Sequence, residues 1–185
     1  MNEHLFNFCP KCGNKSIEFL NGQNWRCKSC DFSFFLDAAA AVAVIAEHNG
    51  KILFERRAKL PRQGFLALPG GFVDKGESLE KAGHREFFEE TGLKCGDLTY
   101  FCSFHNFYEY KGVVYPTCDS FFLTTLSKDC DLTKFDAGEV SSLEWISEDE
   151  IPMDEIAFDS TKGRGFFGRL WEVWSTKIKF SNICQ

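Results

Sequence analysis

Apolar residues in this chain fall into strand-length runs separated by polar turns. The run "DAAAAVAVIAEHNGKILFERR" (37–57) reads as two strands around the turn "HNG", with the first strand apolar enough to be buried on both faces. Three later runs are also strand-like, at 98–110, 113–126 and 139–146. Because Pro61, Pro69 and a Gly-Gly pair interrupt residues 56–78, that segment is predicted to be a long loop.

The segment after this loop has the period of an amphipathic helix. Leu79, Gly83 and Phe87 recur at i, i+4 and i+8 and form one stripe that is predicted to face the core. Ser78 is predicted to cap the N-terminus of the helix, and Gly92 is predicted to end it.

The remaining face of this helix is acidic. Glu86, Glu89 and Glu90 stand at i, i+3 and i+4, where like charges repel by roughly 0.2–0.5 kcal/mol per pair in an isolated helix. Most charge runs are solvated surfaces, and this is the simplest interpretation. The alternative is that the three carboxylates share hard divalent cations, which demand oxygen ligands and would turn the repulsion into attraction.

The cysteines near the N-terminus form two Cys-x2-Cys motifs. Cys9 and Cys12 lie in "CPKCG", Cys27 and Cys30 lie in "CKSCD", and the segment between the motifs reads as a short hairpin that turns at "NGQN". Zn2+ favours four thiolates in a tetrahedron, so we predict a closed zinc ribbon that does no chemistry. Two disulfides or a redox Cys-x-x-Cys are the alternatives, which the expected compartment and the paired motifs disfavour.

One domain boundary is predicted, near residue 36, where the cysteine motifs give way to buried strands. It divides the chain into a ribbon at 1–36 and a larger domain at 37–185. At the far end an apolar helical stripe is expected from Phe167, Leu170, Trp171, Trp174 and Ile178. This stripe is predicted to pack on its own domain, and the surface of a homodimer is the alternative.

The composition fits a globular protein of 185 residues, of which 44% are hydrophobic, with a net charge of −6. No run approaches the roughly 18 apolar residues of a membrane span, so no membrane partner is expected. Because the first residues lack the features of a signal peptide, the expected location is cytoplasmic. The negative charge argues against indiscriminate binding of nucleic acid, although a local basic patch could still hold RNA.

The acidic helix belongs to a longer pattern, "GFVDKGESLEKAGHREFFEETGL" (71–93). The pattern resembles, position for position, the signature of the Nudix hydrolases. The matching residues are Gly71, Glu77, the pair Arg85-Glu86, the pair Glu89-Glu90 and Gly92. The preceding "LPGG" and the order of the strands extend the resemblance over most of 37–150. It implies a Nudix α/β/α sandwich, here with a small N-terminal zinc ribbon. It also implies Mg2+- or Mn2+-dependent hydrolysis of a nucleoside diphosphate linked to another group.

The resemblance also implies roles for individual residues. The implied catalytic set is Glu77, Arg85, Glu86, Glu89 and Glu90, and the implied Mg2+ ligands are Gly70, Glu86, Glu89, Glu90 and Glu139. Gly70 would contribute its carbonyl oxygen, and either Glu86 or Glu89 would be the general base. Arg85 and Glu77 are expected to pair and to hold the loop against the helix, which supports the ligands without doing chemistry.

The substrate is less well defined by the sequence. A four-cysteine ribbon before such a domain resembles the NADH pyrophosphatase branch, but the Ser-Gln-Pro-Trp-Pro-Phe-Pro-like array of that branch is replaced here by "SFHNFYEYKGVVYPT". NAD(H), ADP-ribose and related nucleotides are therefore the expected candidates. The predicted substrate contacts are Arg57, Phe72, Phe107 and Tyr108. Decapping of NAD-capped RNA is one alternative, and a module that binds a nucleotide without cleaving it is another.

Overall fold

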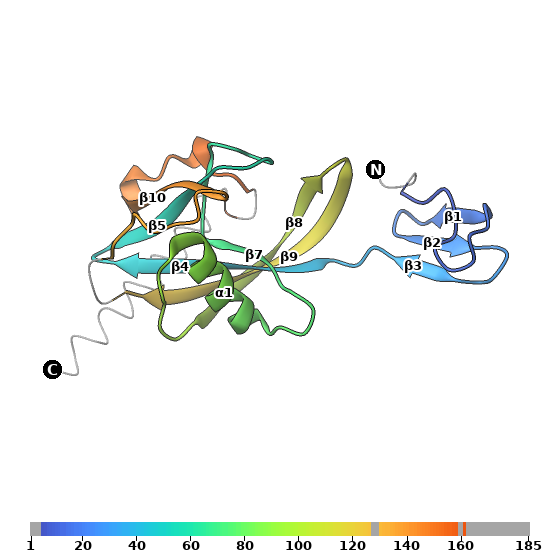
Figure 1. Ribbon diagram of the computed structural model, residues 1–185, viewed down its shortest axis with the longest axis horizontal. Coiled ribbons are helices and arrows are strands. Elements are labelled where there is room, and N and C mark those ends of the chain that lie inside the picture. The colour runs from blue at the N-terminus through green and yellow to red at the C-terminus, as the bar shows by residue number, and fades with distance from the viewer. Residues whose placement is uncertain (1–4, 127–129, 159–160, 162–185) are drawn as a thin grey trace.

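The computed structural model describes residues 5–126, 130–158 and 161, which form a large mixed sheet, one α-helix and a small three-stranded sheet at one end (Figure 1). The small sheet contains β1 (Ile17–Leu20), β2 (Asn24–Cys27) and β3 (Ser33–Phe35). The large sheet contains β4 (Ala39–His48), β5 (Lys51–Arg57), β6 (Leu66–Ala67), β7 (Gly70–Phe72), β8 (Thr99–Tyr110), β9 (Val113–Thr125) and β10 (Val140–Ser147). The helix is α1 (Leu79–Thr91), and two 3-10 turns follow at Glu148–Glu150 and Met153–Glu155.

The predicted pair of strands around "HNG" is present, but β4 and β5 separate soon after their turn. They pair only at Glu47–Ile52 and His48–Lys51. Farther along, β7 pairs with β4 and β6 pairs with β5, while β9 runs parallel to β4 on its other edge. The prediction of an unbroken loop over 56–78 is therefore wrong, because β6 and β7 lie inside it. They supply hydrogen-bond partners for backbone groups that the divergence of β4 and β5 leaves unpaired.

Helix α1 begins and ends at the predicted residues. The Ser78 side chain accepts a hydrogen bond from the Lys81 amide at 3.3 Å, and Gly92 adopts a left-handed conformation with its amide bonded to the Phe88 carbonyl oxygen at 2.8 Å. The buried face of α1 includes Phe87, as predicted, but it also includes Glu90. The prediction that the three glutamates face away from the core is therefore wrong for Glu90. Packing of α1 on β4 and β7 turns this side chain inward.

Apolar side chains cover both faces of β4, which confirms the prediction for this strand. Val44 packs with Leu53 and Phe87 on the side of α1, whereas Ile45 packs with Phe54 and other residues of a second cluster. Val44 and Ile45 are both fully buried, as neighbouring residues of a strand with two covered faces should be. The α/β class follows from this arrangement of one helix on a mixed sheet.

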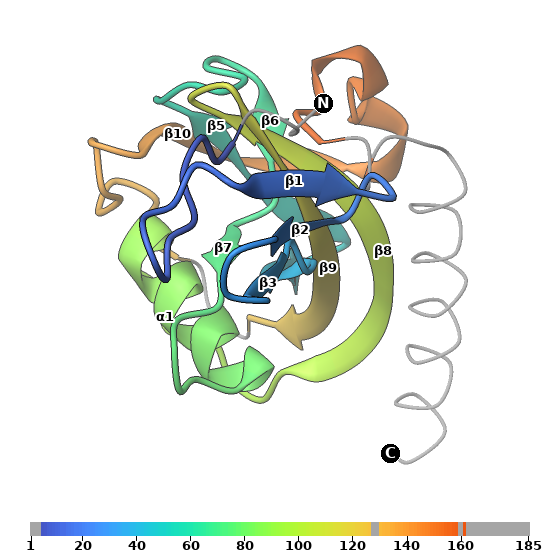
Figure 2. The same ribbon diagram turned by 90° about the vertical axis from the view of Figure 1, so that its right-hand side faces the viewer.

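Figure 2 views the molecule from the end that carries the small sheet, with β1, β2 and β3 in front of the large sheet. The predicted boundary near residue 36 falls between β3 and β4. The predicted apolar helix at 167–178, and with it the alternative of a homodimer surface there, lies outside the described residues. In the part of the chain that the structure covers, α1 is the one α-helix, and no helix combines the length and apolar character needed to cross a bilayer.

Replacement of Gly92 by alanine is expected to destabilise the protein by about 1–3 kcal/mol, because the residue would be held in a left-handed conformation. Gly92 has a φ of 68°, and a Cβ there would lie 2.0 Å from the Lys134 carbonyl oxygen. The matched control is Gly96→Ala, because a Cβ at Gly96 meets nothing within 4 Å. Chemical denaturation of both variants measures the difference, and equal stability of the two would contradict this account of the helix end.

Candidate functional site

A cavity of about 330 Å3 opens where β4 and β7 meet α1 and the β8–β9 hairpin. Its lining combines carboxylates, an arginine and aromatic rings from segments that are far apart in the sequence. The residues that define its chemistry are Arg57, Phe72, Glu86, Glu90, Asn106, Tyr108, Asp119, Glu139 and Phe158. Gly70 lies in the same lining. The structure therefore brings most of the sequence-predicted site residues to one place.

Glu86 lies directly against the backbone of β7. A Cβ at Gly71 would stand 2.6 Å from a carboxylate oxygen of Glu86, so the Glu86 carboxylate can hold this position only while residue 71 lacks a side chain. The Glu86 side chain is 14% exposed and lies 2.7 Å from Nη1 of Arg85. Burial raises the pKa of Glu86 in spite of this ion pair. The surroundings of the Glu86 carboxylate thus favour binding of a proton or of a metal cation at the cavity.

Glu90 lies deeper than Glu86. Its side chain accepts a hydrogen bond from the Gly70 amide at 2.7 Å, which joins α1 to β7. Gly70 in turn packs so close to β4 that a Cβ there would meet the Val42 carbonyl oxygen at 2.1 Å. Burial, followed by the charge of a neighbouring glutamate, raises the pKa of Glu90 well above its ordinary value.

That neighbouring glutamate is Glu55, which the sequence analysis did not identify. It lies on β5, is 2% exposed, and neighbours Glu90. Desolvation by burial raises the pKa of Glu55 to about 7. The available signal was an acidic residue inside the apolar strand run "ILFERR", where an ionisable side chain is rarely buried without a partner.

Arg85 and Glu77 form the predicted pair. Nε and Nη2 of Arg85 donate to the two carboxylate oxygens of Glu77 at 2.9 and 2.8 Å, and Nη2 also donates to the Phe72 carbonyl oxygen at 3.1 Å. This two-point contact with Arg85 holds the pKa of Glu77 at about 2. The pair joins the segment after β7 to α1, whereas its contribution to catalysis stays a prediction.

The two outer carboxylates of the predicted set differ in position. Glu89 is 57% exposed, lies 3.2 Å from Arg85, and does not line the cavity. Glu139 does line the cavity and forms an ion pair with Nζ of Lys59 at 2.6 Å. Of the two residues predicted as general base, only Glu86 therefore faces the cavity.

Aromatic side chains form another wall of the cavity. The Tyr108 ring lies 5.4 Å from the Phe72 ring, nearly perpendicular to it, and 6.2 Å from the Phe158 ring. The Arg57 guanidinium stands over Phe158, 5.1 Å from the ring centre. Among the predicted substrate contacts, Arg57, Phe72 and Tyr108 thus lie in the cavity, together with Phe158, which was not predicted.

Phe107 does not reach this cavity, which corrects the prediction that groups it with Tyr108. Successive side chains of a strand point to opposite faces, so β8 directs these two rings apart. Phe107 is 66% exposed and lines a separate hollow beside Trp25 and Phe35 of the small sheet.

A polar group without a sequence-based prediction lies beside the aromatic wall. Asp119 accepts hydrogen bonds from Oγ1 of Thr117 at 2.7 Å and from Nδ2 of Asn106 at 3.0 Å. Oδ1 of Asn106 accepts from the Phe107 amide at 2.9 Å. These contacts fix the Asp119 carboxylate in the lining, where its remaining lone pairs can only accept hydrogen bonds.

The inner carboxylates fit a hard divalent cation. Mg2+ prefers oxygen ligands and commonly joins a few carboxylates to substrate phosphates. Glu86 and Glu90 face the cavity, their ionised forms are disfavoured by burial, and Arg85 contacts only Glu86 of the two. A cation held by Glu86 and Glu90 would supply the missing positive charge, and Gly70 and Glu139 stay predicted ligands at its edge.

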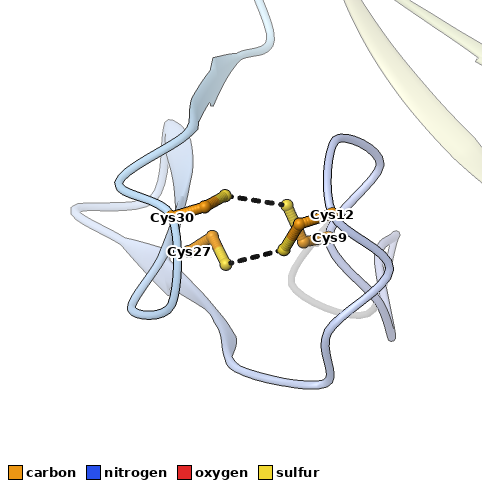
Figure 3. Close-up of side chains that lie close together, drawn as sticks. All are labelled: Cys9, Cys12, Cys27 and Cys30. Carbon is orange, nitrogen blue, oxygen red and sulfur yellow. Dashed lines mark hydrogen bonds between the residues drawn. The ribbon is translucent and has the colours of Figure 1, made fainter.

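The cysteine motifs meet at the small sheet, where the four side chains point toward one another (Figure 3). The sulfurs of Cys9 and Cys30 are 3.8 Å apart, and those of Cys12 and Cys27 are 3.7 Å apart. A tetrahedral zinc with Zn–S distances of about 2.3 Å separates its sulfurs by about 3.8 Å, so the geometry is compatible with structural zinc. The Ser16 side chain lowers the pKa of Cys27 to about 6, which favours the thiolate that zinc binds.

A comparison with known protein families places this site. The profile of the NUDIX domain matches residues 36–163, which is more than half of the chain. The chain belongs to the Nudix family. Among solved structures, this Nudix chain is similar to a NUDIX hydrolase from Nitrosomonas europaea, with a TM-score of 0.61 and 25% identity over 83% of this chain and 85% of the other.

Two curated relatives indicate the range of proteins that this Nudix chain resembles. It is 26% identical to the NAD-capped RNA hydrolase NudC of Haemophilus influenzae over 93% of its own length and 62% of the relative. It is 48% identical to an ADP-ribose pyrophosphatase of Methanocaldococcus jannaschii, over 34% of this chain and 37% of the relative. The chain spans 57–62% of the length of the Haemophilus influenzae relatives that it matches.

The Nudix protein purified without chelator is expected to contain one zinc per chain, because the four sulfurs surround a single centre. Cys12→Ala should remove most of this zinc, whereas Cys118→Ala, an exposed thiol of β9, should retain it. Elemental analysis of the three proteins measures the metal content. Zinc in the Cys12→Ala protein at the unmodified level would rule out the four-thiolate site.

A pH dependence is expected from the Arg85–Glu77 pair. The folded-state pKa of Glu77 is about 2, below its ordinary value of 4.5, so the pair stabilises the fold above about pH 4.5. That stability is lost as the pH falls from about 4.5 to about 2. Melting temperatures over this range should fall less steeply for Glu77→Gln than for the unmodified protein. Glu109→Gln, at an exposed site on β8, is the control and should follow the unmodified profile.

Proposed function

We propose that this protein is a divalent-cation-dependent pyrophosphohydrolase that cleaves the diphosphate of a nucleoside diphosphate linked to another group. NAD(H) and ADP-ribose are the leading substrates. The observation that carries the proposal is one cavity in which Glu86 and Glu90 lie beside an aromatic and polar wall. Such a cavity has room for both the reacting phosphates and a nucleoside.

The carboxylates support the chemical half of the proposal. A bound Mg2+ or Mn2+ would neutralise phosphate charge and lower the pKa of an attacking water. Glu86 is the carboxylate best placed to accept a proton, because it lines the cavity and because burial raises its pKa. Arg85 steadies Glu86 through its 2.7 Å contact while it remains bound to Glu77.

The aromatic wall of the cavity supports the second part of the proposal, which is that the substrate contains a nucleoside. The rings of Phe72, Tyr108 and Phe158 offer apolar faces against which a base can pack, and Arg57 adds a positive charge beside them. Asp119 offers acceptors that suit donor groups of a sugar or an amino group of a base. The ADP-ribose pyrophosphatase and the NAD-capped RNA hydrolase named among the relatives are consistent with such substrates.

Decapping of NAD-capped RNA is the second candidate function, because a relative of that name aligns with 93% of this chain. It would use the same cavity for the NAD portion. A module that binds a nucleotide without cleaving it is less well supported, because every acidic position of the 71–93 pattern is occupied by a glutamate.

A substrate panel tests the proposal. NADH, NAD, ADP-ribose, FAD, UDP-sugars, dinucleoside polyphosphates, oxidised nucleotides and a short NAD-capped RNA are incubated with the protein and Mg2+ or Mn2+. For NADH, NAD, ADP-ribose, FAD and the UDP-sugars, the products identified by mass should be pairs of monophosphates, as expected for cleavage of the bond between the two phosphates. Binding without cleavage across the panel would favour the non-catalytic module, and cleavage of the capped RNA alone would favour decapping.

Glu86→Gln is expected to lower turnover by roughly 10^2 to 10^4, which corresponds to about 3–5 kcal/mol of transition-state stabilisation. Its cation-free stability should change little, because burial already disfavours the ionised form of Glu86. Arg85→Ala should lower both turnover and stability, since it breaks the contacts with Glu77 and Phe72. Two measurements distinguish the Glu86 and Arg85 variants: turnover on the substrate that the panel identifies, and the melting temperature without divalent cation. Turnover near the unmodified rate in Glu86→Gln would remove Glu86 from the catalytic set.

A further inference from the structure

Glu55 is a buried carboxylate whose surroundings do not balance its charge. Only 2% of the residue is exposed, and its Oε2 has no hydrogen-bond partner among the described residues. The residues that pair with Glu55 on the two neighbouring strands are both apolar: Ala67 on β6 and Leu143 on β10. Burying a carboxylate that no hydrogen-bond donor contacts costs folding free energy, so an apolar residue in place of an isolated Glu55 would make the fold more stable.

The nearby arginines are bound elsewhere. Arg56 points to the other face of the sheet, where it pairs with Glu144 at 3.0 Å and Glu155 at 2.9 Å. Arg57 is on the same side as Glu55 and attracts it, but its Nε donates to the Pro61 carbonyl oxygen at 3.0 Å. The contact that Glu55 does make is with another carboxylate, Glu90.

Glu55 therefore adds to the negative charge at the inner end of the cavity. Glu90 is 6% exposed and faces the cavity on one side and Glu55 on the other. Glu86 and Glu139 lie close enough to repel Glu55. Two adjacent buried carboxylates become favourable when they share a divalent cation, because its charge balances both and its coordination sphere takes up oxygen atoms that lack donors.

We propose that Glu55, on β5, is an additional ligand of the divalent cation and binds it together with Glu90 at the inner end of the cavity. The inference rests on the cation requirement of the proposed function but not on the identity of the substrate. With Glu55 as a ligand, β5 becomes part of the cation site. The other predicted ligands lie on α1, on β7 and in the loop before β10.

Cation binding without substrate tests the inference directly. The probe is Mn2+, titrated into the zinc-loaded protein of 185 residues and followed by the electron paramagnetic resonance signal of the free ion. Glu55→Gln keeps the size of the side chain and removes its charge, and it should weaken Mn2+ binding by about 10- to 100-fold. The same variant should melt about 2–4 °C higher than the unmodified protein when no divalent cation is present, because a buried charge has been removed. The rise in melting temperature on adding Mn2+ should be reduced.

Glu144→Gln is the matched control. It lies on β10, next to β5, and contacts Arg56 on the opposite side of the sheet from Glu55. This variant should bind Mn2+ as the unmodified protein does and should melt at a lower temperature, since it loses an ion pair. Glu55→Leu, which carries no polar side-chain atom, should reproduce the weak Mn2+ binding of Glu55→Gln.

Mn2+ affinity at the unmodified level in Glu55→Gln or Glu55→Leu would overturn the inference. So would a fall in the cation-free melting temperature of both variants, because Glu55 would then be required for packing. Weakened Mn2+ binding with normal substrate specificity supports it. If the protein binds Mn2+ through Glu55 but cleaves no member of the substrate panel, the proposed function fails while this inference stands.

Discussion

The close approach of β7 to β4 on one side and to α1 on the other is the constraint on which the site depends. The β4 side requires glycine at Gly70, where a Cβ would strike the Val42 carbonyl oxygen, and on the α1 side a Cβ at Gly71 would displace the Glu86 carboxylate from its position. The Gly70 amide then holds Glu90. This approach is possible only because β4 leaves β5 after two residue pairs and accepts β7 in its place. A glycine pair thus brings the carboxylates of α1 into contact with the sheet.

That contact creates an electrostatic imbalance. Helix packing buries Glu90 against Glu55 and leaves Glu86 partly buried. The positive charge next to Glu86 comes from the Arg85 side chain, which also binds Glu77. The ionised forms of Glu55, Glu86 and Glu90 are all disfavoured by burial. Without a cation the arrangement lowers stability, and with a cation the same carboxylates gain a favourable partner. Stability of the cation-free fold and affinity for the cation therefore oppose each other at Glu55 and Glu90.

The features that could be predicted from the sequence are those set by local chemistry. Ser78 and Gly92 bound α1 as expected, because caps depend on one side chain and one backbone conformation. The long strands follow from apolar periodicity. The inward turn of Glu90, the short strands β6 and β7, and the positions of Glu55 and Asp119 depend on which elements pack together, which no local pattern specifies. Phe107 illustrates the limit, since it was predicted as a substrate contact together with Tyr108, but strand alternation, read from the register of β8, directs only one of the two rings into the cavity.

The same distinction explains why the reaction class is better defined than the substrate. The residues of the acidic pattern lie within one segment, so their spacing alone indicates a cation site. The proposed substrate contacts come instead from Arg57 on β5, Tyr108 on β8, Asp119 on β9 and Phe158 near the end of the described chain. Asp119 is held by two donors from its own sheet, so a group that binds to it must bring further donors. A ribose with free hydroxyls meets this requirement, whereas a phosphate placed there would meet a negative charge. The phosphates of a bound nucleotide should therefore lie toward α1 and its nucleoside toward β9.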